Sequence, residues 1–145
     1  MARNDAVTDG PMRVAVFMGG WSHEHEVSLR SGSAVCAHLE AGRYRVRAVR
    51  LYGKGRAALL DEGVIPAGDS WPATPPSSLL DVMDELAAWG IDIAIPALHG
   101  IGGEDGVIQG FFESLGIPYT HSGVCGAAVS MDKVISKALY RSAGI

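Results

Sequence analysis

Two glycine-rich junctions, each between an apolar run and a segment with helical spacing, constrain the fold of this chain more than any other feature. The first covers residues 18–29 (MGGWSHEHEVSL) and the second covers residues 96–106 (PALHGIGGEDG). Each apolar run is typical of a strand, and the run at residues 13–18 suits a strand buried on both faces, as in parallel sheets. In open α/β folds, the rim where such strands end binds the ligand. The sequence therefore predicts that polar side chains of both junctions lie on one rim of a sheet.

Strand and helix patterns alternate along the chain, which predicts an α/β fold with a mainly parallel sheet and right-handed crossovers. Strands are expected at residues 13–18, 45–51, 91–96 and 117–120. Helices are expected after a cap at Ser22, after a cap at Ser77 or Ser78, from about Glu104 and from Asp132. The arginines of residues 45–51 favour a strand with one wetter face near a sheet edge. Residues 53–76 are rich in glycine and proline, and no helix or strand is predicted for them.

Charge and composition argue against several classes of function. A net charge of -4 argues against nucleic acid as the main partner, and no apolar run approaches the length of a membrane span.

Cys36 and Cys125 lie in apolar surroundings and are expected to be buried free thiols in a reducing compartment. Residues 1–12 lack the apolar core of a signal peptide and are expected to form a disordered lead-in. The end of the chain, just after Gly144, indicates the front piece of a longer protein.

Glu24 is the first candidate for a functional side chain, because it follows the double glycine at the expected start of a helix. A carboxylate there could hold the ammonium group of a substrate. The same carboxylate could equally serve only to complement the helix dipole. The neighbouring Glu26 is interpreted as structural.

His99 and the glycines after it are the second candidate. A histidine at the end of a strand can hydrogen-bond a ligand, or it can be a satisfied core residue. The glycines at 100, 102, 103 and 106 would let backbone N–H groups approach an anion, although such turns also arise for steric reasons alone. Lys133, near the start of the last predicted helix, is typical of a solvated side chain when taken alone.

Two other kinds of site are disfavoured. Residues 23–26 (HEHE) lack the H-E-x-x-H spacing, and alternate positions at a helix start point in different directions. No metal ligands are therefore assigned. The turn at Gly19 and Gly20 lacks the full G-x-G-x-x-G fingerprint, and no acidic residue ends the second strand, which disfavours a dinucleotide-binding oxidoreductase domain.

Five motifs, taken together, resemble the D-alanine–D-alanine ligase family in order and spacing. They are Met18-Gly19-Gly20, Ser22-x-Glu24-His25-Glu26-Val27-Ser28, His99-Gly100-x-x-Gly103-Glu104-Asp105-Gly106, residues 116–120 (GIPYT) and Met131-Asp132-Lys133. The resemblance covers about residues 13–145. It implies a Rossmann-like (pre-ATP-grasp) three-layer domain with a mainly parallel sheet of about four strands over residues 13–122. Residues 123–145 would then be the truncated start of the ATP-grasp region.

The resemblance also implies a reaction and a set of residue roles. Members of this family use ATP, with Mg²⁺ or Mn²⁺, to join two D-alanines through an acyl phosphate for peptidoglycan synthesis. Glu24 and His99 are the catalytic residues that it implies, with Glu24 holding the ammonium of the first D-alanine. Ser28, Gly103 and Glu104 are expected at the same substrate site, and Lys133 is expected to reach the ATP phosphates.

The resemblance further implies a cytoplasmic homodimer. The family's metal-binding acids and second-substrate pocket lie downstream of the residues present here, so these 145 residues alone are predicted to be inactive. The main alternative is a non-catalytic α/β module that binds a small amino acid or an anion.

Overall fold

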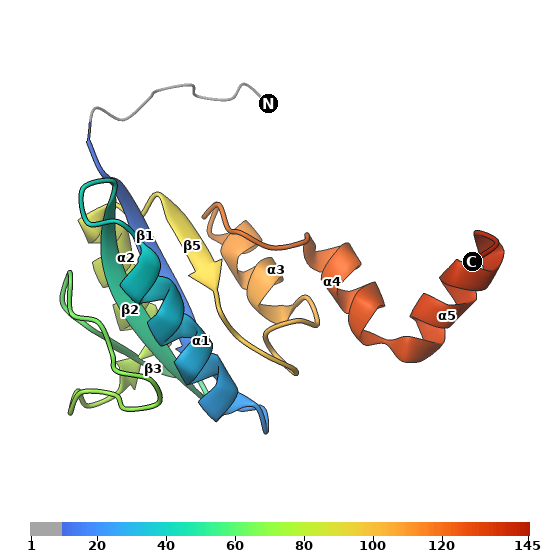
Figure 1. Cartoon of the computed structure of the whole chain (residues 1–145), viewed down its shortest axis with the longest axis horizontal. Helices are drawn as coiled ribbons and strands as arrows, with labels where there is room; N and C mark the ends of the chain where they lie inside the picture. The colour runs from blue at the N-terminus through green and yellow to red at the C-terminus, as the bar shows by residue number, and fades with distance from the viewer. Residues whose placement is uncertain (1–9) are drawn as a thin grey trace.

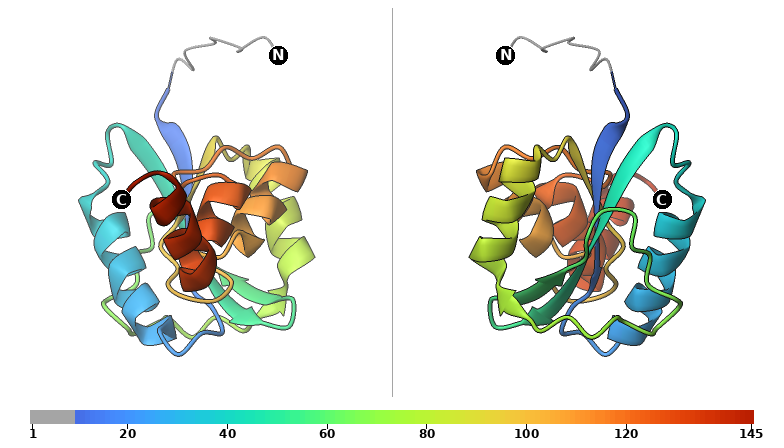
Figure 2. Two further views of the ribbon diagram at one scale, coloured as in Figure 1. Left: turned by 90° about the vertical axis from the view of Figure 1, so that its right-hand side faces the viewer. Right: turned by 90° about the vertical axis from the view of Figure 1, so that its left-hand side faces the viewer.

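A five-stranded sheet forms the centre of the protein in the computed structural model, which describes residues 10–145. The strands are β1 (Met12–Gly19), β2 (Tyr44–Gly53), β3 (Arg56–Leu59), β4 (Ser77–Ser78) and β5 (Ile93–Pro96). The helices are α1 (His25–His38), α2 (Leu79–Trp89), α3 (Val107–Ser114), α4 (Val124–Met131) and α5 (Lys133–Ser142). Helix α1 covers one face of the sheet, whereas α2 and α3 cover the other (Figures 1 and 2). This arrangement confirms the predicted three-layer α/β domain.

The strand order across the sheet is β4-β3-β2-β1-β5. The central strand β1 pairs in parallel with both β2 and β5, whereas β3 and β4 add an antiparallel edge. The sheet thus has five strands instead of about four, because residues 53–78 supply two short strands that the sequence pattern did not reveal. The strand expected at residues 117–120 is reduced to one bridge between Ala94 and Tyr119. Pro118 has no N–H with which to extend that ladder.

The expectation that β2 lies near a sheet edge is wrong, because β2 lies between β1 and β3. Arg47 is only 7% exposed. Its guanidinium donates to the backbone oxygen of Leu60 at 3.0 Å and to Oε1 of Glu85 on α2 at 2.6 Å. The arginine is therefore buried against a carboxylate partner. Alternating charged residues along a strand look the same in the sequence whether they are buried in this way or exposed to solvent.

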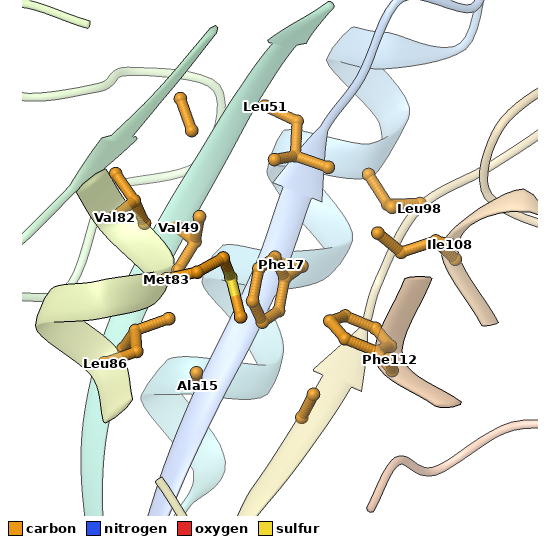
Figure 3. Close-up of a cluster of buried hydrophobic side chains, with 12 residues drawn as sticks. Ala15, Phe17, Val49, Leu51, Val82, Met83, Leu86, Leu98, Ile108 and Phe112 are labelled. Atoms are coloured by element: carbon orange, nitrogen blue, oxygen red, sulfur yellow. The ribbon is translucent and has the colours of Figure 1, made fainter. Parts of the chain in front are cut away.

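Alternation along β1 divides the core into two clusters. Ala15 and Phe17 face α2 and α3, and the Phe17 ring meets the Phe112 ring edge-on, with 4.9 Å between ring centroids (Figure 3). Val14, Val16 and Met18 face α1 instead. Because β1 is buried on both faces, its side chains pack against the helices on either side of the sheet.

Two helices begin where the sequence predicted, one of them after its predicted cap. The Ser78 hydroxyl accepts from Leu80 N–H before α2, which ends at Gly90 in the left-handed conformation. The Asp132 carboxylate accepts from the N–H groups of Val134 and Ile135 before α5.

Two other starts were predicted too early. Helix α1 begins at His25 with Glu24 as its N-cap, while the Ser22 hydroxyl accepts from Glu24 N–H in the turn before it. Helix α3 begins at Val107, because Glu104 and the residue after it use their carboxylates within the preceding loop.

Helix α4 was not predicted, since its residues (VCGAAVSM) are small or apolar and no side chain caps its start. It also carries Cys125, which is exposed, so the expectation of two buried thiols holds only for Cys36. Helix α5 packs against α4, has no buried residue and extends away from the sheet (Figure 1). None of the helices formed by residues 10–145 combines the length and the apolar character needed to cross a bilayer. The predicted lead-in falls largely on residues 1–9, outside the described residues.

Candidate functional site

The two glycine-rich junctions meet at the carboxyl ends of β1 and β5, which are parallel neighbours in the sheet. Ser28 on α1 joins them. Its buried hydroxyl accepts from Gly19 N–H at 2.9 Å and donates to the backbone oxygen of Ala97 at 2.6 Å. The first turns of α1 are thereby held against both strand ends. Both hydrogen-bonding directions of the Ser28 hydroxyl are used inside the protein.

Glu24 lies beside the second junction. A Cβ placed on Gly100 would be 2.7 Å from Oε2 of Glu24, and Gly100 has a φ of +70°. The left-handed backbone favours glycine at this position, and the distance shows how closely the Glu24 carboxylate approaches the loop. Within residues 10–145 the Glu24 carboxylate accepts no hydrogen bond and joins no ion pair. An exposed, unpaired carboxylate at the N-terminal end of α1 is therefore available to a cationic ligand.

His99 is held by two serines of the first junction and of α1. The Ser31 hydroxyl lies 3.0 Å from Nε2 of the His99 ring, and the Ser22 hydroxyl donates to the His99 backbone oxygen at 2.7 Å. Both the ring and the backbone of this half-buried residue are thus oriented from α1 and its preceding turn. Sequence reasoning missed Ser31, although its spacing from Ser28 places both serines on one face of α1.

The loop from Gly100 to Gly106 binds its own carboxylates. Glu104 accepts from Gly100 N–H at 2.7 Å, and Asp105 accepts from Gly102 N–H at 2.8 Å. These N–H groups were expected to be available to an anion, but in the structure they already have anionic partners. Gly102 also lies so close to the Trp21 ring that a Cβ there would overlap it. The loop is consequently a preformed wall beside Glu24.

A family model described as the N-terminus of D-ala D-ala ligase matches residues 13–122. The chain belongs to the D-alanine–D-alanine ligase family. It is 44% identical over 132 residues to the D-alanine–D-alanine ligase of a Methylorubrum extorquens strain, covering 91% of this chain and 34% of the relative. It is 41% identical over 133 residues to that of Desulforudis audaxviator, covering 92% and 35%.

Solved structures of the family share the fold. The D-alanine–D-alanine ligase of Coxiella burnetii aligns with a TM-score of 0.72 and 26% identity, over 94% of this chain and 42% of that one. The Bacillus anthracis ligase, whose structure is a complex with ATP, aligns with a TM-score of 0.68 and 36% identity, over 92% and 37%. The chain thus spans about a third of the length of the curated relatives it matches.

For this ligase-family chain, the structure brings five of the six predicted site residues to one rim. They are Glu24, Ser28, His99, Gly103 and Glu104. Lys133 is the exception. It is the exposed first residue of α5, which stands apart from the sheet (Figure 1). The assigned roles of all six residues remain predictions.

The same rim offers little to a metal ion. Among residues 10–145, no three His, Cys, Asp or Glu side chains are grouped as metal ligands would be. His25, in the HEHE segment, is exposed and its Nδ1 lies 3.3 Å from the backbone oxygen of Ser22. No set of metal ligands is therefore assigned within the described residues.

Proposed function

We propose that this chain forms the D-alanine-binding domain of an ATP-dependent D-alanine–D-alanine ligase of peptidoglycan synthesis. The observation that carries the proposal is the Glu24 carboxylate, which is unpaired within residues 10–145 and lies against Gly100 beside His99. An ammonium group bound there would complete a charge-assisted contact at no cost to an existing ion pair.

In the proposed reaction, Glu24 binds the ammonium of the first D-alanine and His99 hydrogen-bonds in the network around it. ATP phosphorylates the carboxylate of that D-alanine and leaves as ADP. The deprotonated amine of the second D-alanine attacks the carbonyl carbon of the acyl phosphate, and inorganic phosphate leaves as the peptide bond forms. Ser31 and Ser22 orient His99, while the Gly103–Glu104 wall limits the space around the substrate. These groups act by holding the first substrate in one orientation, which lowers the entropy to be lost on reaction.

Groups needed for phosphoryl transfer are sparse in the described residues. Lys133 is the proposed contact to the ATP phosphates, and the Mg²⁺ or Mn²⁺ ligands would come from other parts of the ligase. Stabilisation of charge at the transferring phosphoryl group is a large part of such catalysis. We therefore propose that the 145 residues alone do not turn over ATP. From the family resemblance we also propose that the complete enzyme is a cytoplasmic homodimer.

A chimaera tests this proposal. Residues 1–145 would be joined to the remaining two thirds of the Methylorubrum relative, and phosphate release would be followed with and without D-alanine. We expect D-alanine-dependent release from the chimaera and none from the isolated chain. In the chimaera, Glu24→Gln should lower kcat/KM for D-alanine by about 30- to 100-fold, the size expected for a lost charged contact.

Glu26→Gln is the matched control, because Glu26 is also exposed in the first turn of α1. It should change kcat/KM less than about twofold. Equal activity of the Glu24→Gln chimaera and its parent would remove Glu24 from the substrate site. Phosphate release by the isolated chain would show that the domain needs no further machinery.

A further inference from the structure

Gln109 is a buried polar side chain with no role in the proposed reaction. It lies on α3 between Ile108 and the core residue Phe112 and is fully buried. A buried amide is costly unless hydrogen bonds replace its contacts with water. A fully buried amide therefore calls for an account of its hydrogen-bond partners.

The first hydrogen bond of Gln109 leads directly to the site loop. Its Nε2 donates to the backbone oxygen of Gly103 at 2.7 Å. A backbone oxygen only accepts, so the nitrogen of the amide must face it. Gly103 in turn packs tightly on the preceding residues, since a Cβ there would be 2.5 Å from Cβ of Leu98 and 3.2 Å from the backbone nitrogen of His99. Gly103 therefore lies in close contact with the backbone that carries His99.

The second hydrogen of the same nitrogen points to His121, whose Nδ1 lies 3.1 Å away. Because Gln109 Nε2 is a donor, His121 Nδ1 must accept and the ring proton must be on its Nε2. The 3.4 Å approach of Nδ1 to the Ser122 backbone oxygen is then a contact between two acceptors. His121 lies in the turn before α4 and lines, with Glu104, a cavity against that helix.

We propose that Gln109 is a positioning residue, anchored by His121, that holds the Gly100–Gly106 loop in the conformation that presents His99 and Glu104. What the loop binds rests on the proposed function, whereas the positioning of the loop by Gln109 and His121, called here the positioning device, does not. Gln109 Oε1 is buried and has no hydrogen-bond partner within residues 10–145. That unpaired oxygen makes the amide a poor choice for stability alone, whereas its two donors join three separate segments.

Hydrogen exchange of the isolated chain tests the device without any ligase activity. The reporters are the N–H groups of Gly100, Gly103 and Glu104, which bond to acceptors within the loop. Gln109→Met keeps the volume and the unbranched shape but removes both donors. We expect these three amides to exchange about tenfold faster, while β1 amides and the thermal midpoint change little. The side-chain amide signals of Gln109 should also be protected in the unmodified chain.

Two further variants separate positioning from a general loss of stability. His121→Ala should speed loop exchange about threefold to tenfold, and His121→Asn should restore it, because the Asn oxygen can replace Nδ1 as acceptor. Ser114→Ala is the control on the exposed side of α3, where it removes a hydroxyl bonded to Gly110. Unchanged loop exchange in Gln109→Met, or an equal acceleration of loop and β1 amides, would overturn the proposal.

The chimaera gives the readout on substrate binding. There Gln109→Met should raise KM for D-alanine severalfold and leave KM for ATP within about twofold. Loss of loop protection without a rise in KM for D-alanine would show that the loop does not bind this substrate, which refutes the proposed function but not the device. An inactive chimaera would refute only the ligase assignment, since the exchange measurement stands on its own.

Discussion

Replacing Ser28 with alanine should destabilise the domain far more than the loss of one oxygen atom suggests. The hydroxyl is fully buried, accepts from Gly19 N–H at 2.9 Å and donates to the Ala97 backbone oxygen at 2.6 Å. Water cannot replace it at a buried junction between two strand ends. The substitution therefore leaves a buried donor and a buried acceptor without their common partner.

The expected magnitude follows from those two groups. An unsatisfied buried N–H costs about 1–3 kcal/mol, and the lost hydrogen bond to Ala97 adds about 0.5–1.5 kcal/mol. The sum is about 1.5–4.5 kcal/mol in the free energy of unfolding. For a chain near 150 residues, each kcal/mol lowers the melting temperature by about 2–4 °C, so a fall of about 6–12 °C is expected at the centre of this range.

Urea unfolding of the 145-residue chain, followed by circular dichroism, would measure the change through the midpoint at constant m-value. Ser33→Ala is the matched control, because Ser33 is also buried on α1 but only donates, to Gly68 at 2.6 Å. It should cost about 1 kcal/mol. If Ser28→Ala cost no more than Ser33→Ala, the bridge between the two junctions would not be a main support of the rim.

Further predictions concern packing, pH and thiol chemistry. Gly32→Ala should lower the melting temperature, because the new Cβ would lie 2.6 Å from a methionine Cβ on β1. Gly126→Ala, whose new Cβ would lie 3.5 Å from its nearest neighbour, should instead raise the free energy of unfolding by about 0.5–1 kcal/mol. Thermal denaturation measures both changes. Hydrogen bonds from arginine and tryptophan side chains lower the pKa of Glu62 from 4.5 to about 2. Its contribution to stability is therefore present above pH 4.5 and lost as the pH falls toward 2, so the melting temperature of Glu62→Gln should fall less steeply over that interval. Burial raises the pKa of the Cys36 thiol to about 11 while Cys125 is exposed, so iodoacetamide at about pH 8 should add one group, at Cys125, by peptide mass spectrometry.

Much of the fold could be predicted from local signals. Ser78, Gly90 and Asp132 end or begin helices as their side chains or backbone freedom dictate. The parallel core of β1, β2 and β5 follows from apolar runs that alternate with helical spacing. The short strands β3 and β4 could not be predicted, because two to four residues carry too little periodicity to identify a strand.

The candidate site shows the same division. Glu24 and His99 were recognisable because each follows an apolar strand beside a glycine turn, and parallel strands place such turns on one rim. Ser31 and Gln109 were not recognisable. A serine or glutamine in a helix has the same local pattern whether it faces water or bonds a loop, and only its surroundings distinguish the two.

By itself, the sequence determined the kind of fold, the family and the rim on which the polar residues gather, because these depend on local spacing and on motifs. Only the tertiary structure decided that Arg47 is buried with Glu85, that the loop N–H groups bind Glu104 and Asp105, and that Gln109 joins α3 to that loop. Each of these is a hydrogen bond whose partner is chosen by packing. Residues from 3 to 38 positions apart in the chain meet in this way only when the sheet and its helices exclude water from around them.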